Sequence, residues 1–130
     1  MWHGMDKRRF PRADYQCLIT IIKKGTERNF LTHTQNIGMG GICVVLNEAL
    51  GLFSHVDIEL MLKDEEEPIK CKGNIAWVIK KTEIKNVTPV TNFDTGIEFV
   101  DLKENDKKRI EKIVQYIIQK ETFTKKGEER

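Results

Sequence analysis

The spacing of the apolar residues changes once along this chain of 130 residues, and that change constrains the fold more than any other feature. Over 55–63, HVDIELMLK, apolar side chains occupy every second position, which is typical of a strand with one face in a core. Over 105–120 the spacing becomes three and four residues, which is typical of an amphipathic helix. Alternating segments followed by one helix predict an all-β domain that a single helix closes.

Six segments carry the strand signal, and turn residues separate them. They are 15–24, 29–37, 41–47, 55–63, 69–81 and 96–100. The acidic run 64–67 with Pro68 predicts a hairpin tip, and Gly73 predicts a bulge or bend in the fifth strand. The polar stretch 82–95 is expected to connect the last two strands. Together these signals predict a small six-stranded antiparallel β-barrel, whose interior is filled by side chains.

The helix is predicted over 105–120, where one apolar stripe recurs at helical spacing. The stripe consists of Ile110, Ile113, Val114, Ile117 and Ile118. Asp101 and Glu104 resemble a capping box at its start, and Asn105 is an alternative cap. The charged residues 121–130 have no periodic pattern, so we expect a frayed tail there.

Length and composition bound the organisation of the chain. A chain of 130 residues forms one domain with a real core. The expected parts are a leader at 1–6 and a domain at 7–120, which divides into an arm at 7–14, a barrel at 15–100 and the helix at 105–120, with the tail at 121–130. The formal net charge of +2 is too small to predict coating by nucleic acid or adsorption to a membrane, so any anion binding must be local.

Cysteine usage and hydropathy predict a cytoplasmic protein. Cys17, Cys43 and Cys71 are odd in number, far apart and without CxxC spacing, as expected of reduced thiols. No apolar run is long enough to span a membrane, and no hydrophobic signal region opens the chain. We therefore expect no membrane insertion.

Candidate catalytic and metal-binding residues are few. The three histidines, His3, His33 and His55, lack the spacing of a zinc site, so we expect surface positions for them. The acidic run 64–67 lacks the pattern of a calcium loop and is expected to be solvated. The sequence therefore predicts no enzyme, no metal and no cofactor.

The stretch KRRFPRADY, 7–15, is the most densely basic part of the chain. Pro11 pushes Phe10 towards an extended conformation, so the stretch does not begin a helix. It is either a solvated leader or a folded-back arm that grips an anion. Arginine suits the second role because its planar fork binds phosphate or the guanine O6/N7 edge, and its plane stacks on purines.

A second unusual stretch, NIGMGGI at 36–42, places three glycines within four residues between two predicted strands. No GK[ST] and no helix follow, so a phosphate-binding loop is excluded. The stretch is either a tight β-turn or a place where something approaches the backbone closely. Asn36 favours the second alternative, since an amide can pair with the edge of a base.

With both stretches in view, the sequence resembles the PilZ domains, which bind the bacterial second messenger cyclic di-GMP. The family pattern is RxxxR in an N-terminal arm and [D/N]xSxxG at a later strand turn. Arg8 and Arg12 match the first motif, and Asn36 and Gly41 match the second, but Gly38 stands where the family has serine. The stretches GNIAWV (73–78) and GIEFVDL (96–102), with the helix, resemble the later family elements, so the likeness runs over 7–118.

The resemblance implies a PilZ-type barrel and a non-catalytic cyclic di-GMP receptor that changes conformation to signal to a protein partner. The implied ligand-binding residues are Lys7, Arg8, Arg9, Arg12, Asn36, Gly38, Gly40 and Gly41. The family associates the residue before RxxxR, here Lys7, with binding of one ligand or an intercalated pair. Glycine at position 38 removes a hydroxyl, so binding is expected to be about 1 kcal/mol weaker.

Two rival functions remain open at this point. The first is a ligand-free PilZ-like adaptor that works through protein contacts alone. The second is a small barrel that binds single-stranded nucleic acid, for which Phe10 and Trp77 are the stacking candidates. Basic residues are not gathered into a long groove, so a nucleic acid polymer is not the expected partner.

Overall fold

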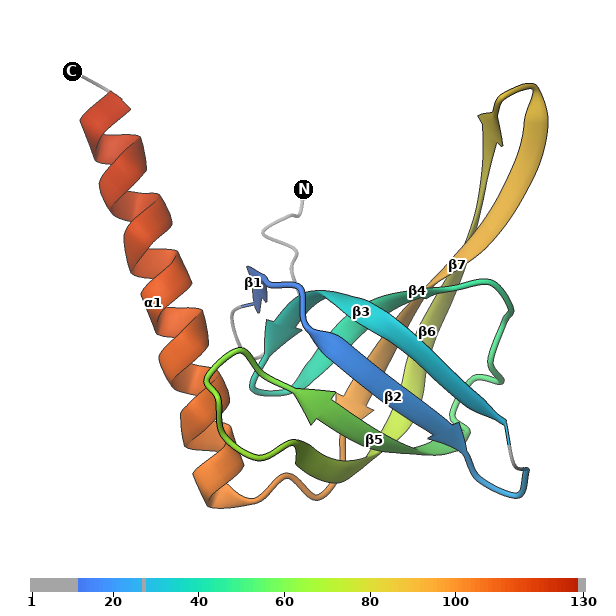
Figure 1. Ribbon diagram of the computed structural model, residues 1–130, viewed down its shortest axis with the longest axis horizontal. Helices are drawn as coiled ribbons and strands as arrows, with labels where there is room; N and C mark the ends of the chain where they lie inside the picture. The colour runs from blue at the N-terminus through green and yellow to red at the C-terminus, as the bar shows by residue number, and fades with distance from the viewer. Residues whose placement is uncertain (1–11, 27, 129–130) are drawn as a thin grey trace.

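Eight elements follow one another in the computed structural model, which describes residues 12–26 and 28–128, with side chains described as far as Glu121 (Figure 1). They are β1 (Arg12–Asp14), β2 (Leu18–Lys23), β3 (Asn29–Gly38), β4 (Gly41–Leu46), β5 (His55–Met61), β6 (Ile69–Lys85), β7 (Thr88–Phe99) and α1 (Glu104–Glu128). No helix in this part of the chain is long and apolar enough to cross a membrane.

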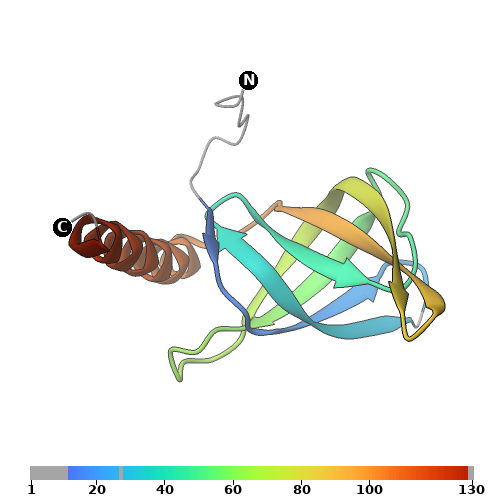
Figure 2. The ribbon, with the colours of Figure 1, turned by 90° about the horizontal axis from the view of Figure 1, so that it is seen from above.

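Strands β2 to β7 form a closed antiparallel barrel. The strands pair in the order β3-β2-β5-β6-β7-β4, and β4 pairs back with β3 to close it. The short β1 is a seventh strand. It pairs with the end of β3, on the edge opposite the one that pairs with β4. Figure 2 shows α1 at one end of the barrel. The predicted six-stranded barrel with one C-terminal helix is confirmed.

The core lies inside the barrel, and the period-two pattern correctly identified the side chains that line it. Ile19 and Ile21 of β2 are fully buried, as is Leu60 of β5. Their neighbours in the sequence point outward and are more exposed. The alternation thus sorts the barrel into an inner apolar face and an outer face on which a ligand could bind.

The hairpin of β6 and β7 is much longer than the sequence predicted. The stretch 82–95, expected as a connection, belongs almost entirely to the two paired strands. Asn86 and Val87 form a two-residue loop in which both φ angles are positive, 50° and 59°. Backbone pairing and polar cross-strand contacts hold these strands together where no core lies beneath them, which explains why apolar alternation did not reveal them. The hairpin projects beyond the barrel in Figure 1.

The predicted bulge at Gly73 is wrong, because the irregularity in β6 lies between Ile75 and Trp77. A Cβ atom at Gly73 would lie 2.7 Å from side-chain atoms of Ile58 and Ile97. Glycine at this position makes room for two core side chains, and the strand stays in register there.

Helix α1 also differs from its prediction at both ends. It continues to Glu128, so the stretch 121–128 is helical and not a frayed tail. Asp101 does not cap it, since its Oδ1 accepts a hydrogen bond from the backbone N–H of Lys72 at 2.6 Å. The apolar stripe is as predicted: Ile110 and Val114 are buried, and the helix packs against β1 and β3.

Candidate functional site

Two stretches far apart in the sequence meet where β1 pairs with β3. The register places Arg12 opposite Gly38 and Asp14 opposite Asn36. The end of the basic arm therefore lies directly beside the start of the glycine-rich turn. Lys7, Arg8 and Arg9, the other cations predicted for the site, lie outside the described residues.

A row of outward-facing residues continues from this point across the barrel. Asn36 lies opposite Cys43 on β4, Cys43 opposite Gly96 on β7, and Gly96 opposite Trp77 on β6. The neighbouring residues Ile37, Ile42 and Ile97 are buried inside the barrel, so strand alternation points this row away from the interior, although Cys43 and Gly96 are themselves buried. The row begins at the polar Asn36 and ends at the aromatic Trp77, with the two small residues Cys43 and Gly96 between them.

Asn36 is the polar group in this row whose environment points to a ligand. Its Oδ1 atom is buried and accepts no hydrogen bond within the part of the chain that the structure describes. A buried acceptor without a donor costs about 1–3 kcal/mol, and such groups are rare in native proteins. The position is therefore suited to a ligand that brings N–H groups.

Arg12 supplies positive charge beside Asn36. Its side chain is half-buried, and its guanidinium is close enough to act on the thiol of Cys43. Burial raises the pKa of that thiol, and Asp94 raises it further, while Arg12 offsets part of the rise. The thiol stays protonated, so it is a small, buried, neutral group and not a nucleophile.

The glycines of the site differ in what they do. A Cβ atom at Gly41 would collide with the carbonyl oxygen of Ile97, so Gly41 allows β4 and β7 to approach closely. The carbonyl of Gly40 accepts a hydrogen bond from the N–H of Phe99 at 2.9 Å. Gly38 is buried at the end of β3, opposite Arg12. Gly40 and Gly41 thus have roles in the barrel itself.

Trp77 is a site candidate that the sequence analysis considered as a stacking residue for nucleic acid, with burial in an alternating strand as the default. Its indole lies across Gly96, where a Cβ atom would collide with the ring. The side chain is half-buried, so part of the ring stays accessible. Glycine opposite tryptophan at 96 and 77 was the available signal, but only the strand register shows that they are neighbours.

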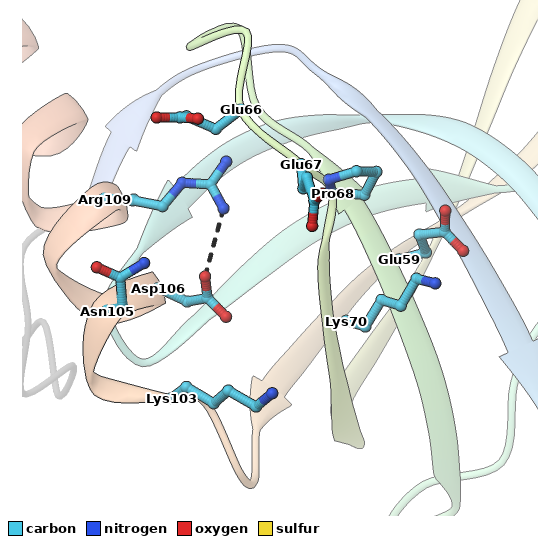
Figure 3. Close-up of a pocket in the computed structure, with 9 residues that line it drawn as sticks. All are labelled: Glu59, Glu66, Glu67, Pro68, Lys70, Lys103, Asn105, Asp106 and Arg109. Carbon is cyan, nitrogen blue, oxygen red and sulfur yellow. Dashed lines mark hydrogen bonds and ion pairs between the residues drawn. The ribbon is translucent and has the colours of Figure 1, made fainter.

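A separate cleft of about 960 Å³ lies between the β5–β6 turn and the start of α1 (Figure 3). Its lining residues are Glu59, Glu66, Glu67, Pro68, Lys70, Lys103, Asn105, Asp106 and Arg109. Four carboxylates against three cations make it poorly suited to a doubly charged phosphate ligand. The outer face near Arg12 and Asn36 is the better candidate.

Arg109 beside this cleft ties the helix to the barrel. It donates two hydrogen bonds of 2.9 Å to the carboxylate of Asp64 in the β5–β6 turn and one of 3.3 Å to Asp106. These bonds lower the pKa of Asp64 below its ordinary value. Asp64 was expected to be solvated with the rest of 64–67, and that prediction is wrong for this residue.

The other residues considered for chemistry lie apart from the row. His33 and His55 are exposed on strands, and His55 Nδ1 contacts Asn74 Oδ1 at 2.5 Å. Cys17 and Cys71 are buried, and burial raises the pKa of Cys71 to about 12. These thiols are core residues.

Comparison with known families and structures gives a consistent result. The family model for the PilZ domain matches residues 6–118. No curated protein matches the sequence. The match includes both stretches that the sequence singled out.

Solved structures share the fold at low sequence identity. The PilZ domain with c-di-GMP of YcgR from Escherichia coli has a TM-score of 0.70 at 12% identity, covering 92% of this chain and 98% of that one. The K. pneumonia MrkH–c-di-GMP complex has a TM-score of 0.70 at 20% identity, covering 91% and 55%. The inhibitor of motility of Bacillus subtilis has a TM-score of 0.65 at 21% identity, covering 89% and 51%. The chain thus spans about half the length of the last two proteins.

Proposed function

The chain belongs to the PilZ domain family, and on that premise we propose that it is a receptor for cyclic di-GMP. The observation that carries the proposal is the β1–β3 register, which sets Arg12 opposite Gly38 and Asp14 opposite Asn36. Arg12, the last residue of the first motif, thereby lies next to the second motif, which supports a shared site. Two of the similar structures are described as c-di-GMP complexes, which supports the same ligand here.

Guanine fits the unpartnered amide of Asn36. The Watson–Crick edge of guanine carries an N–H and an amino group, and these donors would satisfy the buried Oδ1 atom of Asn36. The O6/N7 edge of the same base accepts a bidentate arginine fork, which Arg12 can supply. One base could therefore contact both residues, and neither contact suits adenine equally well.

The phosphates are assigned to the basic arm. Arg8 precedes Arg12 by four residues, so it can be no more than about 14 Å of chain from the site. Lys7 and Arg9 are within similar reach. Charge-assisted hydrogen bonds contribute about 1.5–3 kcal/mol each, so a few of them suffice for micromolar binding after the arm is ordered.

Trp77 is proposed as a second base contact at the far end of the row. A purine would meet the accessible outer part of the indole, whose inner part covers Gly96. Stacking on an aromatic ring contributes about 1–3 kcal/mol per base. This contact supports affinity without base specificity.

Signalling is proposed to use the surface that the arm and α1 share. The helix packs against β1 and β3, the two strands that hold Arg12 and Asn36. Ordering of the arm that precedes β1 over a ligand would therefore change the surface beside α1 and offer it to a partner protein. The domain performs no chemistry on its ligand in this proposal.

The second candidate function, a ligand-free adaptor, is favoured by one residue. Gly38 has no hydroxyl where the family motif has serine, so one ligand contact is missing. The adaptor would work through the same surface with no nucleotide bound.

Titration calorimetry with cyclic di-GMP distinguishes the two functions. Cyclic di-AMP is the control, because it has the same phosphates and different base edges. We expect heat from cyclic di-GMP with a dissociation constant between submicromolar and tens of micromolar, and binding of cyclic di-AMP at least about tenfold weaker. No heat from either nucleotide at high protein concentration would contradict the receptor and leave the adaptor.

A further inference from the structure

The projecting β6–β7 hairpin has a free backbone edge that the proposed receptor function does not use. β5 pairs with β6 only as far as Asn74, and the preceding loop adds hydrogen bonds at Ile75. From Trp77 to Lys85, this edge of β6 pairs with no other strand in the described part of the chain. Figure 1 shows this segment extending away from the barrel.

The turn at the tip determines which backbone groups face that edge. Positive φ at both loop residues makes a type I′ turn, in which Lys85 and Thr88 exchange hydrogen bonds. Hydrogen-bonding direction alternates along a strand, so Lys81, Glu83 and Lys85 use their backbone groups towards β7. The backbone groups of Lys80, Thr82 and Ile84 therefore point out at the free edge.

Proline, one of the usual protections against strand addition, is absent from this edge, although lysines at 80, 81 and 85 lie along it. On β7, Pro89 lacks an N–H group, which blocks pairing along that side. The segment 77–85 of β6 contains no proline. Apolar side chains nearby are unusually exposed, with Ile84 at 77% and Val87 at 95%. Such a segment can accept another strand.

We propose that the edge pairs with the same edge of a second copy of this chain, antiparallel, with the two-fold axis at Thr82. In this register Lys81 lies opposite Glu83 of the second copy, and Glu83 lies opposite Lys81 of the second copy. Both pairs occupy non-hydrogen-bonded positions, where facing side chains are closest. The segment is thus complementary in charge to itself, and this complementarity selects a second copy as the occupant.

Neighbouring registers are disfavoured by the same charges. Moving the axis by one residue sets Lys81 opposite Lys81 or Glu83 opposite Glu83, and like charges directly opposite destabilise a strand pair. Lys81 is held in place by Asp94, with Nζ 2.6 Å from Oδ2. Strand alternation puts Lys81 and Glu83 on one face of β6, so Lys81 contacts Asp94 of its own chain and, in the dimer, Glu83 of the second copy as well.

The interface is small, so association is expected at high protein concentration. A pair of short edges buries less than a standard interface of about 1,600 Å², which predicts a dissociation constant in the range of about 10 μM to 1 mM. Sedimentation of the nucleotide-free protein across that range should show a monomer–dimer equilibrium. A pure monomer at the highest concentration would overturn the proposal.

Charge reversal tests the register. Glu83→Lys and Lys81→Glu should each reduce dimerisation at least about tenfold, because each places like charges in both pairs. An equimolar mixture of the two variants should form a heterodimer, since every pair then regains opposite charges. Glu59→Lys is the matched control, because it makes the same charge change on a strand whose two edges are both paired. Unchanged dimers in Glu83→Lys, or no recovery in the mixture, would refute this register.

A disulfide gives a second readout that does not depend on affinity. Opposing residues in a hydrogen-bonded pair have Cα atoms about 5.5 Å apart, within the range of a disulfide. Thr82→Cys should therefore cross-link two chains under mild oxidation. Thr91 is the neighbour of Thr82 within the same chain, and their hydroxyls lie 3.2 Å apart. Thr91 is on β7, away from the proposed interface, so Thr91→Cys should not cross-link two chains. Equal cross-linking of both variants would indicate random collision and contradict the two-fold axis at Thr82.

Discussion

At the scale of single residues, Arg12 and Asn36 carry the proposed specificity. Arg12→Ala should weaken cyclic di-GMP binding at least about tenfold, because it removes a fork with several donors. Asn36→Ala should weaken it less, since an amide donates and accepts fewer charge-assisted bonds. Calorimetry measures the affinity of both variants. Arg28→Ala is the control, because Arg28 pairs with Glu48 near the start of β3, at the end opposite Gly38. Asn36→Ala binding like the unmodified protein would make the turn merely structural.

A second prediction at this scale separates packing from ligand binding at Gly41. Gly41→Ala should lower the free energy of unfolding by about 1–3 kcal/mol, because its Cβ would collide with the backbone of β7. Urea unfolding without ligand measures this. Gly51→Ala is the control, since a Cβ there would come no closer than 3.8 Å to Ser54. If Gly41→Ala unfolds like the unmodified protein, the close approach of β4 and β7 is not needed for stability.

At the scale of elements, the Asp64–Arg109 pair fastens α1 to the β5–β6 turn. The hydrogen bonds from Arg109 lower the pKa of Asp64, so the pair stabilises the fold only while the carboxylate is ionised. That contribution is complete above the ordinary aspartate pKa and is lost as pH falls through the lowered one, below about pH 4. Asp64→Asn should therefore lower the urea midpoint at pH 7 and lower it much less under strongly acidic conditions.

The exposed pair Lys24–Asp57 is the control for that experiment. Its side chains are 49% and 42% exposed, against 15% and 26% for Arg109 and Asp64. Exposed pairs contribute little, so Asp57→Asn should change the urea midpoint only slightly at either pH. A pH-independent loss in Asp64→Asn would show that shape at this position matters, and not charge.

At the scale of the whole molecule, binding depends on how much positive charge the arm brings to the barrel. The net charge of the chain is only +2, so attraction of an anion must be local to the arm and screened by salt. We expect the affinity for cyclic di-GMP to fall as ionic strength rises. An affinity that stays constant over a wide salt range would show that stacking and base-edge contacts dominate.

Stoichiometry is the second property of the whole molecule. An intercalated pair of ligands brings four phosphates together, and Lys7, Arg8, Arg9 and Arg12 would supply four charges to match them. Calorimetry should therefore give a ratio of about two ligands per chain, and Lys7→Leu should move it towards about one. A ratio of one in the fully competent unmodified protein would leave Lys7 without a role in pairing ligands.

The sequence by itself determined the fold class, the inner face of the barrel and the family. Period-two alternation and the helical stripe report burial through each residue's near neighbours, so Ile19, Leu60 and Ile110 could be placed in the core. The family match confirms the resemblance that the two motifs suggested. The site residues themselves stay predictions.

Only the tertiary structure decided which distant residues are neighbours. The meeting of Arg12 with Gly38, the indole of Trp77 over Gly96, and the pairing of Asp64 with Arg109 depend on strand register and helix docking. The long hairpin escaped detection because its strands are held by backbone pairing with no apolar face to mark them. Register and docking are set by contacts between segments far apart in the chain. The local pattern of apolar residues does not indicate which distant residue pairs with a given strand position.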